Sequence, residues 1–246
     1  AASDVYKRQI LLFTVTFSKS YKISGTFLTK EQPKYVYLYD LWGNYLQNSV
    51  DSSLVKKGVF TFTYEDKNLE GLYYIGANKQ KASPIIIAEE NISVIAQGID
   101  FSSISIENSP ANTFFKEYLA ENKNFEEGFA KINKEFQEKV APLEKVDAVK
   151  YNQEYQRLVQ EIQKTRANYK TFLSNLTKHS NSFVQKIGNL LEINDVTNQL
   201  NYFSKNEFYD ESITRGDFIV RKVNLYFTFF STLNAKTLPQ QTELLL

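Results

Sequence analysis

The stretch at residues 35–75 constrains the fold of this chain most, because three β-favouring runs follow one another there with turn residues between them. The runs are residues 35–39 (YVYLY), 59–64 (VFTFTY) and 72–75 (LYYI). Aromatic and β-branched residues are enriched in strands, whereas Gly, Asn and Asp favour turns. The stretch therefore predicts the centre of an antiparallel β domain, followed by a helical part after Pro110.

The alternation within these runs indicates which side chains share a face. Tyr35, Tyr37 and Tyr39 should point to one side of their strand, and Phe60 and Phe62 should point into the core. Further strands are expected at residues 23–28, 45–50, 84–88, 92–96 and 103–106. Strands at such short, regular spacing are typical of a sandwich or barrel.

Three turns are predicted, at residues 40–44, at Lys57 and Gly58, and at Glu90 and Asn91. The first and the last of them are expected to close hairpins. Gly and Asn tolerate the positive φ that tight hairpin turns require.

The second half of the chain carries apolar residues at helical spacing. Ser109 should cap a helix that begins at Pro110, and Pro142 should break it. A second run from Tyr151 to Leu176 predicts a partner helix of roughly 40 Å, so the two form a long antiparallel pair. Such a stripe is more often core than a seam for another protein. Additional helices are expected at residues 181–192, 196–204 and 218–234.

The predicted fold class is therefore α+β with segregated parts: an antiparallel β-sandwich-like domain at residues 21–108, then a helical domain at residues 109–236 with the long antiparallel helix pair. Residues 237–246 look like a connector at which the chain is cut. Arg221, Lys222 and Asn224 exclude a membrane span in the aromatic segment near the end.

Residues 1–20 are interpreted as an adapter-derived scar followed by a signal-peptide remnant, and residues 1–9 resemble no structural element. Residues 4–9 resemble a translated sequencing adapter, and the apolar block at residues 10–17 fits the remnant of a signal peptide, which predicts export to the periplasm or cell envelope. The alternatives are an ordinary polar N-terminus and a first β-strand.

Composition excludes several classes of function. The chain has 29 Lys and Arg against 28 Asp and Glu, so no basic field favours nucleic acid. It has no cysteine, which excludes a disulfide, a Cys-x-x-Cys redox centre or a thiolate metal site in this chain.

The remaining candidate residues give no catalytic pattern. His179 is the single histidine and is expected in an exposed loop, where one imidazole cannot form a typical zinc site. Two adjacent carboxylate pairs, Glu89–Glu90 and Glu126–Glu127, are expected to be solvated. Asp210, Glu211 and Asp217 near Arg215 suggest an exposed ion-pair network without function. No catalytic, cofactor-binding or metal residue is therefore predicted, and no cofactor.

The β-rich part carries a recurrent pattern: Ile23-x-Gly25, Tyr35-x-Tyr37-Leu38-Tyr39-Asp40, Gly58-x-Phe60-x-Phe62, then residues 71–75 (GLYYI), residues 84–87 (PIII) and Ile104-x-Ile106-x-Asn108-Ser109. Over about residues 22–118 this pattern resembles a β domain of unknown function that precedes thioredoxin-like modules in exported, Bacteroidetes-type thiol–disulfide oxidoreductases. Residues 201–215 more weakly resemble the helical linker region of such proteins. The resemblance implies a catalytic thioredoxin-like domain further along, and its cysteines match nothing in this sequence.

The expected function is thus a non-catalytic accessory region that positions a thioredoxin-like domain or another protein partner. The alternative is a stand-alone envelope module that binds a glycan or peptide through exposed tyrosines and Trp42. An enzyme in its own right is the least favoured reading.

Overall fold

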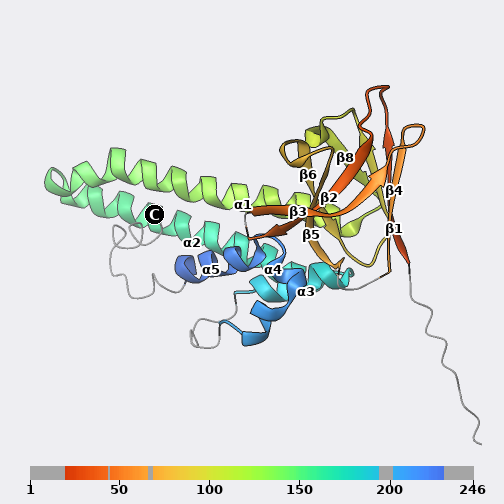
Figure 1. Ribbon diagram of the computed structural model, residues 1–246. Helices are drawn as coiled ribbons and strands as arrows, with labels where there is room; N and C mark the ends of the chain where they lie inside the picture. The colour runs from red at the N-terminus through yellow and green to blue at the C-terminus, as the bar shows by residue number, and fades with distance from the viewer. Residues whose placement is uncertain (1–19, 44, 66–68, 194–201, 230–246) are drawn as a thin grey trace, which may run out of the picture.

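The computed structural model describes residues 20–43, 45–65, 69–193 and 202–229. It consists of a β sandwich with helices against one side and a long helix pair that projects away from it (Figure 1). The predicted α+β class, with strands first and helices after, is confirmed. The strands are β1 Tyr21–Phe27, β2 Tyr35–Trp42, β3 Tyr45–Leu54, β4 Val59–Tyr64, β5 Gly71–Gly76, β6 Ala82–Ile87, β7 Ile92–Ala96 and β8 Ile104–Glu107.

The strands form two four-stranded sheets, with the orders β4-β1-β7-β8 and β3-β2-β5-β6. Most neighbours are antiparallel, while β1 and β7 pair in parallel. The turn predicted at Lys57 and Gly58 is present: both residues have positive φ, and Lys56 and Val59 exchange two backbone hydrogen bonds around them. This turn carries the chain from one sheet to the other.

The hairpin predicted at Glu90 and Asn91 is wrong. The strand before it, β6, lies in one sheet, and the strand after it, β7, lies in the other. Ile85 and Ile87 of β6 and Ile92 of β7 all face the space between the two sheets, so the chain crosses the end of the sandwich instead of turning back within one sheet. The buried Tyr64 hydroxyl donates to the carbonyl oxygens of Ala88 and Glu90 at 3.1 and 2.7 Å. These hydrogen bonds fix the path of the crossing segment.

The inner core fills the space between the two sheets. Phe60 and Phe62 point inward as predicted, and Phe60 packs on Phe27 and Phe101. Gly25 in β1 lies directly under the Phe60 ring, where an added Cβ would approach a ring atom to 1.9 Å. Glycine at this position therefore makes room for the Phe60 ring in the inner core.

A second apolar core lies on the outer face of the sheet that contains β2, β5 and β6. Leu72 and Ile86 of that face belong to the same buried cluster as Phe114, Phe183 and Phe218 of the helices. The helices are α1 Pro110–Glu135, α2 Ala148–Leu176, α3 Ser182–Leu191, α4 Glu211–Thr214 and α5 Phe218–Phe229. The helical layer is thus built directly onto the sandwich.

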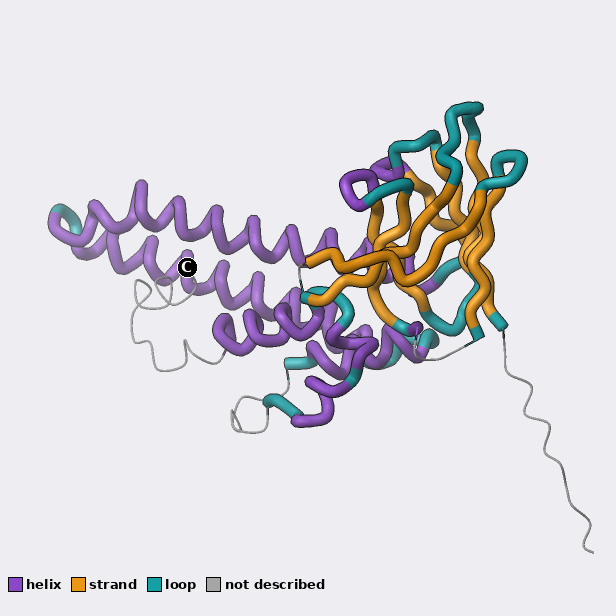
Figure 2. The backbone as a smooth tube through the Cα atoms, in the orientation of Figure 1, coloured by secondary structure: helices purple, strands orange, loops and turns teal. Residues whose placement is uncertain are grey.

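Helices α1 and α2 form the predicted antiparallel pair (Figure 2). The Ser109 hydroxyl accepts the amide N–H of Asn112, with Pro110 opening the helix, as expected from the sequence. The break at Pro142 is also present: a π-helical turn, η4 Phe136–Val140, and a 3₁₀ turn, η5 Ala141–Lys145, end the first helix. The far end of the pair has its own apolar cluster, formed by Ile132, Phe136, Val140, Leu158 and Ile162.

The shorter helices agree with the sequence where the structure describes them. The helix predicted at residues 181–192 is α3, and Gly188 lets it cross the end of α2, because a Cβ there would lie 2.5 Å from the Leu176 backbone. Residues 202–204 are not helical, and the rest of the helix predicted at 196–204 lies outside the described residues. The same holds for the predicted helix end at 230–234. No described helix combines the length and the apolar character that crossing a bilayer requires.

Candidate functional site

A polar hollow of about 680 Å³ lies where the helical layer meets the sandwich. Residues from four segments of the chain line it: Glu70, Glu89, Ser182, Lys186, Tyr209, Asp210, Glu211 and Ser212. A second hollow of about 400 Å³ adjoins it and shares Ser182 and Lys186. This junction brings charged side chains of the sandwich and of the helical layer together around one hollow, so it is the candidate site.

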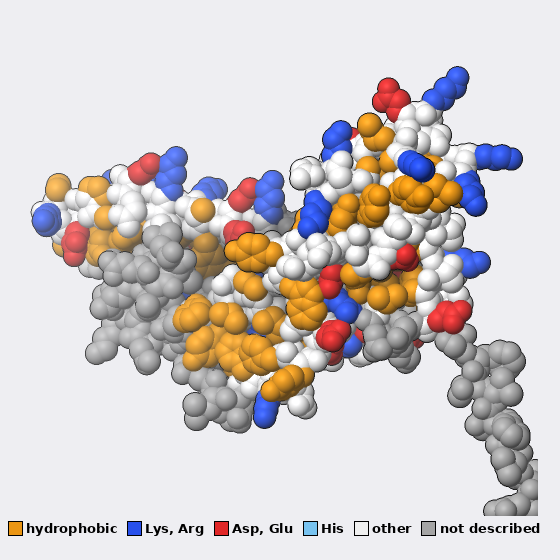
Figure 3. All heavy atoms as spheres, viewed as in Figure 1, with side chains coloured by type: hydrophobic (Ala, Val, Ile, Leu, Met, Phe, Trp, Pro, Cys, Tyr) orange, Lys and Arg blue, Asp and Glu red, His pale blue; other side chains and the backbone are white. Residues whose placement is uncertain are grey.

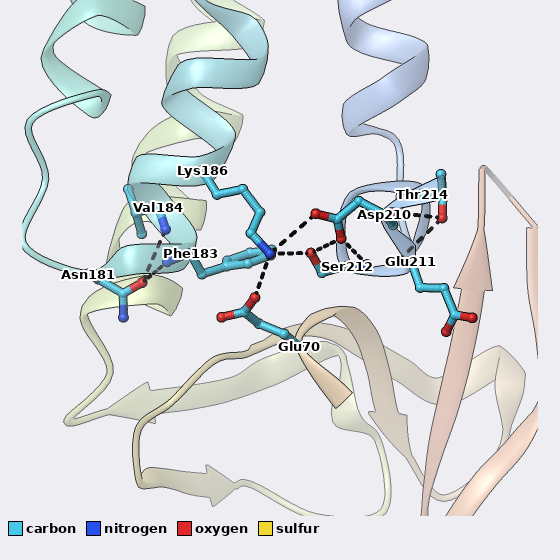
Figure 4. A network of polar contacts seen from close by, with 9 residues as sticks. All are labelled: Glu70, Asn181, Phe183, Val184, Lys186, Asp210, Glu211, Ser212 and Thr214. Carbon is cyan, nitrogen blue, oxygen red and sulfur yellow. Dashed lines mark hydrogen bonds and ion pairs between the residues drawn. The ribbon is translucent and has the colours of Figure 1, made fainter. Parts of the chain in front are cut away.

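Lys186 is the centre of the hollow (Figure 4). From the middle of α3 its ammonium Nζ donates to Glu70 Oε2 at 2.8 Å and to Ser212 Oγ at 2.8 Å, and it lies 3.5 Å from Asp210 Oδ2. Glu70 directly precedes β5, and Asp210 caps the start of α4 by accepting the Ser212 amide. The lysine therefore ties α3 to both the sandwich and α4.

The electrostatics of the cluster keep Lys186 charged. Burial lowers the pKa of Lys186, but the hydrogen bond and charge of Glu70, with Asp210, outweigh burial and raise that pKa above its ordinary value. Burial acts to raise the pKa of Asp210, and the Ser212 and Lys186 contacts outweigh it and lower that pKa. A lysine held in the protonated form has no free electron pair, so it serves as a fixed cation and not as a nucleophile or base.

A second junction surrounds Glu90. Its carboxylate accepts hydrogen bonds from the Ser109 hydroxyl, from the Ala111 amide at 3.3 Å and from Asn181 Nδ2 at 3.2 Å. The side chain thus joins the chain crossing after β6 to the first residues of α1 and α3. Burial raises the pKa of Glu90 above its ordinary value, although these donors oppose it. The prediction of a solvated carboxylate at Glu90 is therefore wrong, while Glu89 beside it is exposed.

A third junction is formed by Arg215, between α4 and α5. Its side chain is 12% exposed and lies 3.4 Å from the carboxylate of Asp40, which is 13% exposed. The guanidinium also faces the Tyr73 ring at 5.6 Å from the ring centroid. The next residue, Gly216, has a φ of +113° and donates its amide N–H to the Leu41 carbonyl at 3.1 Å.

The exposed network predicted around Arg215 is therefore only partly right. Arg215 does bind Glu211, which is 63% exposed, but its main surroundings are the end of the sandwich. Asp217 is partly buried, because α5 packs against α1 and α2 there. Sequence reasoning placed all these charges on the surface because acidic and basic residues close together in a chain usually lie there.

The other candidates stay apart from the hollow. His179 lies in the turn between α2 and α3, half-buried instead of exposed, with its Nδ1 accepting the Asn181 amide at 3.1 Å. Glu126 and Glu127 are exposed on α1, and Glu126 binds Arg221. Within the described ranges, no group of three His, Cys, Asp or Glu residues is arranged to hold a metal ion.

Two residues that organise the junctions, Lys186 and Glu70, were not found from the sequence. Their bond joins positions 116 residues apart, and neither belongs to a recognisable motif. Only the N-cap at Asn181, which precedes α3, could have marked the start of the helix that presents Lys186.

Hydrophobic side chains gather on the surface of the helical part seen in Figure 3. Exposed aromatic residues of the helical part include Phe208 and Tyr209 of η7 (Lys205–Tyr209) and Phe227 of α5, with exposed fractions of 49, 73 and 50%. Tyr209 also lines the polar hollow. Tyr209 therefore adds an aromatic side chain to the otherwise polar lining of the hollow.

Comparison with protein families gives one match. Residues 21–115 match the family model described as Domain of unknown function (DUF4369). The matched segment contains strands β1 to β8 and the first residues of α1, and it ends at Phe115, whose ring packs in the core that the helices share with the sheet. The predicted N-terminal domain of unknown function is confirmed to this extent. Neither the curated proteins nor the solved structures contain a significant match to the chain.

Proposed function

We propose that this chain is a non-catalytic interaction region of an exported thioredoxin-like thiol–disulfide oxidoreductase, in which it positions the redox domain or a protein partner in the cell envelope. The pattern of residues 22–118 supports the family context, as does the match of residues 21–115 to a domain of unknown function. The fixed protonation of Lys186 supports a structural role for the charged hollow.

The observation that carries the proposal is the projecting pair of α1 and α2 (Figure 1). Its far half is held by the separate apolar cluster around Phe136 and Leu158, so it adds no packing to the sandwich. At its tip Val146 and Val149 are 84% and 70% exposed. This projecting α1–α2 pair, the arm, is well packed within itself and presents apolar residues at its end. It is therefore suited to contact another protein.

The first test reads the gene beyond the codon for Leu246 and expresses any thioredoxin-like domain encoded there. Isothermal titration calorimetry then measures its binding to this chain and to the double variant V146D/V149D. We expect the double variant to weaken binding at least tenfold, because two buried carboxylates at an interface are strongly unfavourable. The matched control is V50D, at an exposed valine of β3.

The proposal fails if the frame encodes no thioredoxin-like domain. It also fails if the encoded domain binds neither the wild type nor V50D while both remain folded. Equal binding by V50D and V146D/V149D would show that the tip of the arm is not the contact.

The alternative, a stand-alone glycan- or peptide-binding module, is favoured by a row of tyrosines on β2, of which Tyr35 and Tyr37 are accessible and Tyr39 is buried. Tyr35, Tyr37 and Tyr39 lie on one face as predicted, with neighbouring ring centroids 6.3 and 6.0 Å apart. The single tryptophan, Trp42, lies at the end of the same strand and is 41% exposed. Saturable binding of a polysaccharide, measured by isothermal titration calorimetry and abolished in Y35A/Y37A, would favour this alternative.

A further inference from the structure

Asp217 places a carboxyl group between helices at the start of α5. Its backbone carbonyl accepts the Arg221 amide at 2.7 Å, so Asp217 occupies the position just before the helix. Its Oδ1 is buried and has no hydrogen-bond partner among the described residues. The same is true of the hydroxyl of Tyr118, a fully buried residue of α1.

Arg221 does not neutralise Asp217, although four residues separate them on one helix and such pairs can meet. The guanidinium of Arg221 donates to Glu126 Oε1 at 2.5 Å and, through Nε and Nη2, to the Tyr169 hydroxyl at 3.3 Å. No ion pair joins Asp217 to Arg221 in the described part of the chain. An ionised Asp217 would thus add a second negative charge beside an Arg221–Glu126 pair that is already neutral.

Titratable side chains of several neighbouring elements interact electrostatically with the Asp217 carboxylate. They are Tyr74 of β5, Tyr118 and Glu126 of α1, Tyr169 of α2, and Arg221 of α5 itself. The N-terminal end of α5 and the backbone amide of Asp217 itself favour a negative charge, whereas removal from water favours the neutral acid. Burial raises the pKa of Asp217 even though Arg221 opposes it, so burial is the stronger influence.

We propose that Asp217 is a protonation-dependent latch for α5: the neutral carboxyl keeps the first turn of α5 packed against α1 and α2, and ionisation loosens that turn. A neutral carboxyl also has an O–H that can donate to an oxygen, which the carboxylate lacks. Because the pKa is raised on folding, the stabilisation is complete below the unfolded value, about 4, and is lost as pH rises through the folded value.

The test is hydrogen–deuterium exchange of the amides of residues 219–225 in the full chain between pH 4 and 8, corrected for the intrinsic rate. The wild type should lose protection as pH rises, by at most tenfold per pH unit, and then level off. D217N should lack the part of this loss that Asp217 contributes, so its protection should fall less with pH than that of the wild type. The matched control E127Q removes a carboxylate that is 67% exposed and should follow the wild type.

Identical pH profiles for the wild type and D217N would overturn the proposal. If D217N does not fold, the carboxyl carbon of Asp217 in the wild type decides the question by nuclear magnetic resonance. A titration midpoint at or below about 4, the value of an unperturbed aspartate, would overturn the latch, and a midpoint above it that coincides with the loss of protection would support it.

Discussion

The side chain of Asn112 hydrogen-bonds both backbone groups of Ile86: its Nδ2 donates to the Ile86 carbonyl at 2.8 Å, and its Oδ1 accepts the Ile86 amide at 2.8 Å. Ile86 lies in β6, the last strand of its sheet. One side chain from the first turn of α1 therefore satisfies two backbone groups of this edge strand that a neighbouring strand would otherwise hydrogen-bond. The same two bonds join the helix to the sheet.

Replacing Asn112 by alanine should lower the free energy of unfolding by about 2 to 4 kcal/mol, because two buried backbone groups lose their partners. Urea denaturation measures the change. N124A, at an exposed position of the same helix, should stay within about 0.5 kcal/mol of the wild type. A loss of the same small size in N112A would mean that water replaces the side chain at no cost.

The elements of this fold could be predicted because their signals are local. Ser109 and Pro110 mark a helix start by their own chemistry, and Lys57 and Gly58 mark a turn. Which strand a given strand pairs with, in contrast, cannot be deduced from the residues close to it in the sequence. Residues 85–87 and 92–95 have the same isoleucine-rich pattern, and only the second sheet decides that the chain crosses between them.

The junction residues show the same limit for the site. Glu90, Lys186 and Arg215 look like ordinary surface charges in the sequence, and each is defined by partners far away in the chain. Their burial follows from the helical layer covering one sheet, which no pattern of neighbouring residues encodes.

Glu90 should make the stability of the chain depend on pH. Its pKa is raised on folding from an ordinary value of 4.5, so its contribution is complete below pH 4.5 and is lost as pH rises through the folded value. The E90Q variant lacks this loss. Urea denaturation from pH 4 to 8 should therefore show that the free energy of unfolding of E90Q increases relative to that of the wild type as pH rises.

E117Q, at an exposed glutamate of α1, serves as the control for Glu90 and should parallel the wild type. A constant difference between E90Q and the wild type across this range would contradict the raised pKa of Glu90.

Lys186 and Glu70 should be energetically coupled. K186M leaves two carboxylates near each other without their cation, and E70Q removes one of them. Because the Lys186 side chain is 35% exposed, solvent limits the coupling to about 1 kcal/mol in a double-mutant cycle, and added salt should reduce it. The exposed Lys123–Glu127 pair is the control, with a coupling close to zero. Equal coupling energies in the two cycles would show that the hollow gives Lys186 no special environment.

The separate cluster in the far half of the arm should make its unfolding local. Leu158 is fully buried there, and L158A should cost about 2 to 5 kcal/mol, the usual range for such a truncation. Hydrogen–deuterium exchange should show residues 132–162 losing protection while the sandwich strands keep theirs, because the two parts share no core. L173A, at an equally buried leucine of α2 in the core shared with the sheet, should instead weaken the helical layer and the sheet together. If both variants lose protection over the whole chain alike, the arm is not an independent unit, and its projecting tip could not be altered without disturbing the sandwich.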